Sequence, residues 1–426
     1  MSSGLYSKEL HLVAMIDKIK TFFTSMATPS PVGIRSGLER SYYPELDSLR
    51  FFAFLMVFGF HHGVPNLGGS VRDLLAMTID LPLLLIFQTT GFGTLLGPTI
   101  DHALLMNGWI GVNLFFTLSG FIITRLLLRE ESQFGRIDWL AFWVRRILRI
   151  WPLYFLIFLI GFFGLPLTNR IHGIGPQSPH LPWFATFIGN WSMIRFGPIG
   201  SDILSVLWSV CVEEQFYIFI PIILALLGNR GRWLFTICGI IIAIAVRKSL
   251  ADQGLEQFKI TYNSLAQMDS ILAGVMLALA IHNPKLRHCM VQYASQFSVW
   301  LILPASLFLI TRRHLGHDIV TRQVFDPVAI WMVALAWIWI AANGSRPFSK
   351  LLTWPPFVGL GKISYGLYMY HELLLTLFGG GFLTLAGVVV TAYVSYELLE
   401  KPILKYKHRW SRVESRPLPL KISPDS

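Results

Sequence analysis

Residues 44–62 read Pro44-Glu-Leu-Asp-Ser-Leu-Arg50-Phe-Phe-Ala-Phe-Leu-Met-Val-Phe-Gly-Phe60-His61-His62. The ten residues 51–60 carry no polar side chain, so the stretch predicts an apolar helix with a guanidinium at one end and an imidazole at the other. Eleven helical steps of about 100° return His61 to within about 20° of the face that carries Arg50, about 16 Å further along the axis. Charged or titratable groups in a membrane helix are costly and usually face a polar cavity. The stretch therefore points to chemistry inside a membrane.

The composition indicates that lipid is the main solvent of this chain. Hydrophobic residues make up 54% and charged residues 14% of the 426 residues, and the mean hydropathy is +0.56. In soluble domains about a quarter of residues are charged. Cys211, Cys238 and Cys289 have no metal-type spacing, so neither a disulfide nor a zinc site is expected. We expect an all-α polytopic protein, integral to the cell (inner or plasma) membrane.

Ten apolar segments are candidate membrane spans. With the N-terminus inside, 26 of the 35 Lys and Arg lie in cytosolic segments, as the positive-inside rule requires. This predicts about ten transmembrane helices with N- and C-termini cytoplasmic. The net charge of +11 then needs no nucleic-acid partner. The ten segments are 47–64, 109–128, 148–168, 204–228, 233–247, 263–281, 297–311, 328–343, 363–380 and 381–399.

Three regions are expected along the chain. Region 1–45 is interpreted as a cytosolic amphipathic helix and linker, although a disordered tail fits as well. A transmembrane domain fills 46–400, and a basic cytosolic tail follows at 401–426. Within the domain, 63–107 is broken by prolines and glycines and is expected to be a long outer-face insertion. Segment 181–194 is short and is expected to dip into the membrane without crossing it.

Five further segments place polar residues in apolar surroundings. They read Trp109-Ile-Gly-Val-Asn-Leu-Phe-Phe-Thr-Leu-Ser119-Gly120-Phe121, Arg145-Arg146-Ile-Leu-Arg149-Ile-Trp-Pro152, Leu207-Trp-Ser-Val-Cys-Val-Glu213-Glu214-Gln215-Phe-Tyr217, Gly361-Lys-Ile-Ser-Tyr-Gly-Leu-Tyr-Met-Tyr370-His371 and Glu397-Leu-Leu-Glu400-Lys-Pro402. In this order and spacing, together with the Arg-x10-His helix, the chain resembles the acyltransferase 3 family from about Glu45 to Pro402. These are integral-membrane enzymes that O-acylate sugars, lipopolysaccharide, peptidoglycan and macrolides.

The resemblance implies a ten-span bundle, an acyl-CoA donor on the cytosolic side, and an acceptor hydroxyl on or reached from the opposite side. It also implies that Arg50 and His61 are essential. Acetyl-CoA is the expected donor substrate, no cofactor is expected to be bound permanently, and the acceptor is expected to be a glycan, glycolipid or small molecule. The chain departs from the family pattern at Ser48, where Gly is usual, and at Gln267, where Arg is common, so the role of Asp269 stays open.

O-acylation needs a base for the acceptor hydroxyl, a site for a polyanionic thioester and stabilisation of an oxyanion. His61 is the candidate base, because a neutral imidazole titrates close to pH 7. A histidine that merely ends a helix is the plain alternative. Arg50 could bind a phosphate or the oxyanion, or anchor the helix at the cytosolic face. We predict the catalytic roles for both.

For each of the remaining candidate residues, a purely structural role is an alternative to a functional one. Arg145, Arg146 and Arg149 could hold the phosphates of coenzyme A or contact lipid headgroups. Glu213 and Glu214 could orient an imidazole, pair with an arginine or form a structural ion pair, and at most one should enter the cavity. A further set is expected to line the cavity, with Ser119 there for packing rather than as a nucleophile. That set is Ser119, Tyr217, Tyr370 and His371.

Two other function classes remain open at this point. A secondary transporter also has many spans and buried charges, but no internal repeat supports it. Alternatively, the chain passes acyl groups to a separate esterase-like partner, because 401–426 is too short to form the hydrolase-like domain that many relatives carry.

Overall fold

A computed structural model describes residues 40, 42–61, 109–164, 177–293, 298, 301–302, 304–306, 319–343 and 346–410. All regular structure in these ranges is helical. The helices longer than seven residues are α2 (Pro44–His61), α5 (Trp109–Phe134), α6 (Trp139–Leu159), α8 (Gly189–Phe196), α10 (Leu207–Leu226), α11 (Asn229–Asp252), α13 (Ser264–His282), α14 (Pro284–Gln292), α16 (Ile319–Asn343), α18 (Pro355–Lys362), α19 (Ser364–Phe378) and α20 (Phe382–Ser395).

Short elements connect or extend these helices. They are η3 (Ile160–Gly164), α7 (Leu181–Ala185), α9 (Asp202–Ser205), α12 (Gln257–Thr261), α17 (Arg346–Leu352), η5 (Tyr396–Glu400), α21 (Lys401–Tyr406) and η6 (Lys407–Trp410). Segment 181–194 thus forms the short helices α7 and most of α8 instead of a single span, in agreement with its proline and its length.

The chain is an all-α polytopic membrane protein. Seven of the described helical stretches are long and apolar enough to cross a membrane. They are Ile110–Phe134, Trp139–Gly164, Asp202–Leu226, Asn229–Asp252, Ser264–His282, Gln323–Asn343 and Phe382–Tyr406. Two further predicted spans, 47–64 and 363–380, correspond to α2 and α19, which are helical but shorter or more charged.

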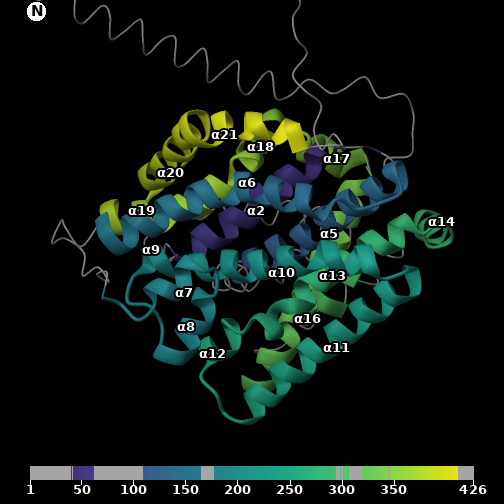
Figure 1. Ribbon diagram of the computed structural model, residues 1–426, viewed down its shortest axis with the longest axis horizontal. Helices are drawn as coiled ribbons and strands as arrows, with labels where there is room; N and C mark the ends of the chain where they lie inside the picture. Colours follow the sequence, from purple (N-terminus) through teal and green to yellow (C-terminus); the bar gives the residue numbers. More distant parts are fainter. Residues whose placement is uncertain are drawn as a thin grey trace, which may run out of the picture.

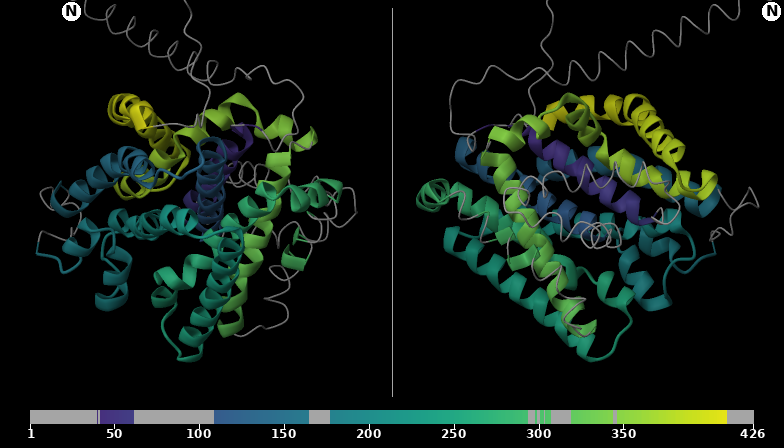
Figure 2. Two further views of the ribbon diagram at one scale, coloured as in Figure 1. Left: turned by 45° about the vertical axis from the view of Figure 1, so that its right-hand side comes forward. Right: turned by 180° about the vertical axis from the view of Figure 1, so that it is seen from behind.

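Helix α2 runs through the centre of the bundle (Figure 1). Pro44 begins it, where the missing N–H costs nothing, and Glu45 and Asp47 complement the positive end of the helix dipole. Fourteen of its residues are buried, because it packs against α5, α18 and α19. In all views the C-terminal helices α20 and α21 (yellow) lie at the opposite end of the bundle from α11 (teal green) (Figure 2). The predicted polar-ended helix is therefore an uninterrupted central helix.

Helices α5 and α13 cross at two glycines. A Cβ on Gly120 would lie 2.0 Å from the carbonyl oxygen of Ile271, and one on Gly274 would lie 2.1 Å from that of Thr117. Small residues allow this close backbone approach. The hydroxyl of Ser270 donates to Oδ1 of Asn113 across the same interface at 2.6 Å. Gly120, the residue after Ser119, therefore lies at a close approach of α5 and α13.

Asp269 belongs to a buried ion pair. Arg247 of α11 donates to both of its carboxylate oxygens, at 3.1 and 2.7 Å, and the two side chains are 1% and 0% exposed. Trp331 of α16 donates a third hydrogen bond to Asp269 at 3.2 Å. Because this carboxylate is fully compensated inside the protein, its role is to tie α11, α13 and α16 together.

Several predictions fall outside the described residues. They concern the amphipathic helix and linker of region 1–45, the outer-face insertion 63–107, part of the predicted span 297–311 and the tail beyond residue 410. His62 also lies outside them.

Candidate active site

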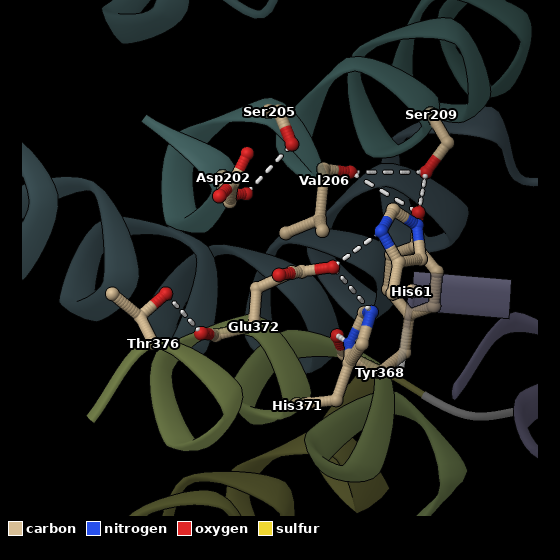
Figure 3. A network of polar contacts seen from close by, with 9 residues as sticks. All are labelled: His61, Asp202, Ser205, Val206, Ser209, Tyr368, His371, Glu372 and Thr376. Carbon is tan, nitrogen blue, oxygen red and sulfur yellow. Dashed lines mark hydrogen bonds and ion pairs between the residues drawn. The ribbon is translucent and has the colours of Figure 1, made fainter. Parts of the chain in front are cut away.

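His61, the last residue of α2, meets α19 at a carboxylate. Its Nδ1 lies 2.5 Å from Oε1 of Glu372, and the two side chains are 34% and 6% exposed (Figure 3). The imidazole is thus open on one side and fixed by a buried acidic group on the other. With Nδ1 held by Glu372, Nε2 of His61 is the nitrogen available to exchange a proton.

His371 completes the group, which we name the His61 cluster: His61, His371 and Glu372. Its ring is fully buried and lies 5.3 Å from the ring of His61, centroid to centroid. Nδ1 is 2.5 Å from the carbonyl oxygen of Tyr368, which fixes that nitrogen as the N–H donor. Nε2 is buried, lies 3.5 Å from Oε1 of Glu372, and makes no hydrogen bond to any described residue.

The same three side chains are a possible metal-ligand group. Each offers one ligand atom, and these atoms lie within 4.8 Å of one another. The cysteine spacing could not indicate this group, because it contains no cysteine and joins the end of α2 to two adjacent residues of α19.

Glu213 lies in a second polar group, on α10. The hydroxyl of Ser119 donates to its Oε1 at 2.6 Å, and the hydroxyl of Tyr217 donates to its Oε2 at 3.2 Å. Arg50 and Arg146 also interact electrostatically with this carboxylate. Three predicted site residues from α2, α5 and α6 are therefore brought together around Glu213.

Glu214 points elsewhere. Its Oε2 accepts a hydrogen bond from Trp151 Nε1 at 3.0 Å, and its Oε1 is buried without a hydrogen bond among the described residues. Adjacent helical residues point about 100° apart, as expected for this pair. The carboxylate that contacts His61 is Glu372, so neither Glu213 nor Glu214 orients that imidazole.

The three arginines of α6 differ in their partners. Arg145 is paired with Glu130 at 3.1 Å and donates to the carbonyl of Trp410. Arg149 donates to the carbonyl of Lys362 at 3.2 Å. Arg146 lies over the rings of Phe142 and Tyr217, at 5.5 and 5.8 Å, and makes no hydrogen bond or ion pair with a described residue.

Arg50 has a partner on its own helix, and Tyr370 has one on a neighbouring helix. Arg50 contacts Asp47, one helical turn earlier, at 3.3 Å, and its side chain is 25% exposed. Tyr370 donates to the hydroxyl of Ser395 on α20 at 2.9 Å. Tyr370 therefore joins two helices at a position next to His371.

Glu372 was not among the site residues predicted from the sequence. It follows His371 in an apolar helix, and a carboxylate in such a helix is a functional candidate by default. The sequence contained that signal. It did not indicate that Glu372 contacts His61, because residues so distant in the chain meet only in the folded bundle.

A family model described as an acyltransferase domain matches residues 43–397. The chain belongs to the acyltransferase 3 family. The matched range contains the His61 cluster, the Glu213 group and all three arginines of α6.

The matches to curated relatives cover only part of the length of those proteins. The O-acetyltransferase OatA of Staphylococcus aureus (strain NCTC 8325 / PS 47) is 24% identical over 330 residues, 71% of this chain and 53% of the relative. YrhL of Bacillus subtilis (strain 168), provisionally named a peptidoglycan O-acetyltransferase, is 28% identical over 334 residues, 70% of this chain and 50% of the relative. A provisionally named O-acetyltransferase of S. aureus (strain COL) is 27% identical over 331 residues, which cover 71% of this chain and 53% of the relative. The chain thus spans about half the length of these relatives. No solved structure matches it.

Proposed function

We propose that this chain is a membrane-embedded O-acyltransferase. It moves an acyl group, with acetyl as the leading candidate, from acyl-CoA to a hydroxyl of a carbohydrate or other glycan-type acceptor. The observation that carries the proposal is the contact between His61 and Glu372 at 2.5 Å, at the end of the central helix. Family membership and the O-acetyltransferase names of the relatives support the reaction class.

His61 acts as the general base in this proposal. Glu372 holds Nδ1–H, so that Nε2 takes the proton of the acceptor hydroxyl as its oxygen attacks the thioester carbonyl. The carbon–oxygen bond forms, the carbon–sulfur bond breaks, and the proton passes to the departing thiolate of coenzyme A. A base oriented by a buried carboxylate needs no rearrangement before each turnover.

The donor binds at the other polar group. Arg146 presents a guanidinium without an ion-pair partner among the described residues, held by two aromatic rings. Guanidinium groups suit phosphates, so Arg146, with Arg50 and Arg149 beside it, is proposed to hold the phosphates of coenzyme A. The pantetheine arm then extends along α2 toward His61, over an axial distance of about 16 Å from Arg50.

In this arrangement the donor and the acceptor reach the protein from opposite faces of the membrane. We propose ten spans with both termini cytoplasmic, an acyl-CoA donor from the cytosol, and an acceptor that reaches His61 from the outer side. The imbalance of basic residues between the two sets of loops supports this orientation.

One assay tests the function and separates the alternatives. Purified protein is incubated with labelled acetyl-CoA and candidate glycans, and the label is followed to a hydroxyl ester. Transfer by the wild type, with a loss of about 10²–10⁴-fold in properly inserted His61→Ala, supports the proposal. Wild-type turnover by His61→Ala would overturn the base assignment.

The alternatives give different results in the same assay. A relay protein transfers acyl groups only after an esterase-like partner is added. A secondary transporter catalyses no ester formation in either condition.

A further inference from the structure

We propose that the His61 cluster also binds Zn²⁺ and that the bound ion blocks acyl transfer. Each of His61, His371 and Glu372 offers one ligand atom, and these atoms lie within 4.8 Å of one another. We assign Nδ1 of His61 and Nε2 of His371 as the nitrogen ligands, because these are the ring nitrogens that face Glu372. Two imidazoles and one carboxylate, with a fourth position left open, form a donor set that zinc takes in proteins. The binding site follows from this geometry alone, whereas the inhibition rests on the proposed function, in which His61 is the base.

His371 is the preorganised ligand. Its side chain is fully buried, and its Nδ1 lies 2.5 Å from the carbonyl oxygen of Tyr368. Zinc-binding histidines commonly donate their second N–H to such a carbonyl, which fixes the tautomer and the ring orientation. The lone pair of Nε2 then points toward Glu372, and no described residue gives it a hydrogen bond.

The spacing between His371 and Glu372 already suits a metal ion. Nε2 and Oε1 are 3.5 Å apart. A tetrahedral zinc ion with bonds of about 2.0–2.1 Å separates its ligand atoms by about 3.3 Å. A lone pair and a carboxylate at this distance repel each other unless a cation or a proton lies between them, so the pair favours an incoming cation.

His61 is the ligand that must move. Its Nδ1 lies 2.5 Å from Oε1 of Glu372, too close for two ligands of one ion. The side chain is about one-third exposed and belongs to the last residue of α2, so a rotamer change can open the contact by about 1 Å without disturbing the core. Ion binding is therefore compatible with the rest of the fold.

The bound ion removes the base. A neutral imidazole carries one N–H and one lone pair, so zinc on Nδ1 leaves the proton on Nε2. His61 can then no longer accept the proton of an acceptor hydroxyl. Zinc at this cluster is thus inhibitory and does not activate the acceptor.

Binding is tested without reference to activity. The full chain, purified in detergent through a histidine-free tag, is titrated with Co²⁺, whose tetrahedral complexes absorb in the visible range, and Zn²⁺ is used to displace it. We expect one site in the wild type and at least about tenfold weaker binding in His371→Ala. His180→Ala is the matched control, since His180 contacts Ser192 outside the cluster. Absence of the absorption, or equal affinity in His371→Ala, would overturn the site.

Inhibition is tested separately with the labelled acetyl-CoA assay. Zn²⁺ should slow transfer, a chelator should restore it, and Mg²⁺ should have no effect because it prefers oxygen ligands. If Co²⁺ binds while Zn²⁺ leaves the rate unchanged or raises it, the inhibitory role is wrong. If no transfer occurs under any condition, the proposed function fails, and the Co²⁺ titration still decides the site.

Discussion

Glu372 is the residue on which the proposed chemistry of His61 depends. It is nearly buried, and its carboxylate is shared by two imidazoles (Figure 3). Replacing Glu372 with Gln keeps the shape but removes the charge that stabilises the imidazolium formed during transfer. We expect kcat to fall by about 10²-fold with KM for acetyl-CoA nearly unchanged. Steady-state kinetics on the purified variant measure both values.

Glu214→Gln is the control for that variant. It removes an equally buried carboxylate from α10, but one that contacts Trp151 and not His61. Its kcat should fall much less than that of Glu372→Gln. Equal losses in the two variants would show that buried charge, and not contact with the base, sets the rate.

Arg146 should act on the donor alone. Arg146→Gln removes a charge-assisted contact with phosphate, so the apparent KM for acetyl-CoA should rise by about 10- to 100-fold at little cost in kcat. Arg145→Gln is its neighbour control, because Arg145 is already paired with Glu130. A KM increase in Arg145→Gln as large as in Arg146→Gln would contradict the assignment of the phosphates to Arg146. An unchanged KM in Arg146→Gln would make that arginine a topology signal.

At this scale the sequence predicted residues better than their partners. Arg50 and His61 were recognisable because polar groups stand out at the ends of an apolar run. Their neighbours were not recognisable, because a contact such as that of Ser119 with Glu213 joins positions 94 residues apart on different helices. The different states of Arg145 and Arg146 likewise depend on side chains of other helices.

The crossing of α5 and α13 sets the position of Ser119. Gly120→Ala would place a methyl group 2.0 Å from the carbonyl oxygen of Ile271, which neither backbone can avoid without moving. Overpacking of this kind costs about 1–3 kcal/mol. We expect a lower Tm in detergent and reduced transfer, measured by thermal unfolding and by the labelled acetyl-CoA assay.

Gly387→Ala in α20 is the matched control, because its Cβ would meet nothing closer than Leu374 Cδ1 at 3.8 Å. Its Tm should stay the same or rise slightly, since alanine favours helix. A stable Gly120→Ala protein would mean that α5 and α13 can separate freely.

Helices were predictable from the sequence where a single feature, such as an apolar run or a proline, decided the local structure. The apolar run 51–60 predicted the helix that the structure shows as α2, and the proline and short length of 181–194 predicted that this segment is not a single span. Helix α6 begins at Trp139, nine residues before the predicted membrane span 148–168, because a helix can continue beyond the apolar segment that defines a span. In the structure Asp138 caps that helix by accepting a hydrogen bond from the backbone N–H of Ala141.

The whole molecule contains two polar groups, the His61 cluster and the residues around Glu213, on different parts of one helical bundle. Asp202 of α9 lies beside the His61 cluster (Figure 3), and α9 packs against α19. Lys405 belongs to α21, which packs against α6, the helix that carries Arg146. Transfer across the membrane requires these two exposed positions to face opposite sides.

Cysteine accessibility tests this requirement. Asp202→Cys and Lys405→Cys are made separately in a background in which the exposed Cys238 and Cys289 are serine. A membrane-impermeant thiol reagent added to intact cells should label Asp202→Cys and leave Lys405→Cys unlabelled until the cells are opened. The expected sides follow from the basic cytosolic segments, to which 401–426 belongs. Labelling of both positions from one side would overturn transmembrane transfer, since donor and acceptor would then meet the protein at the same face.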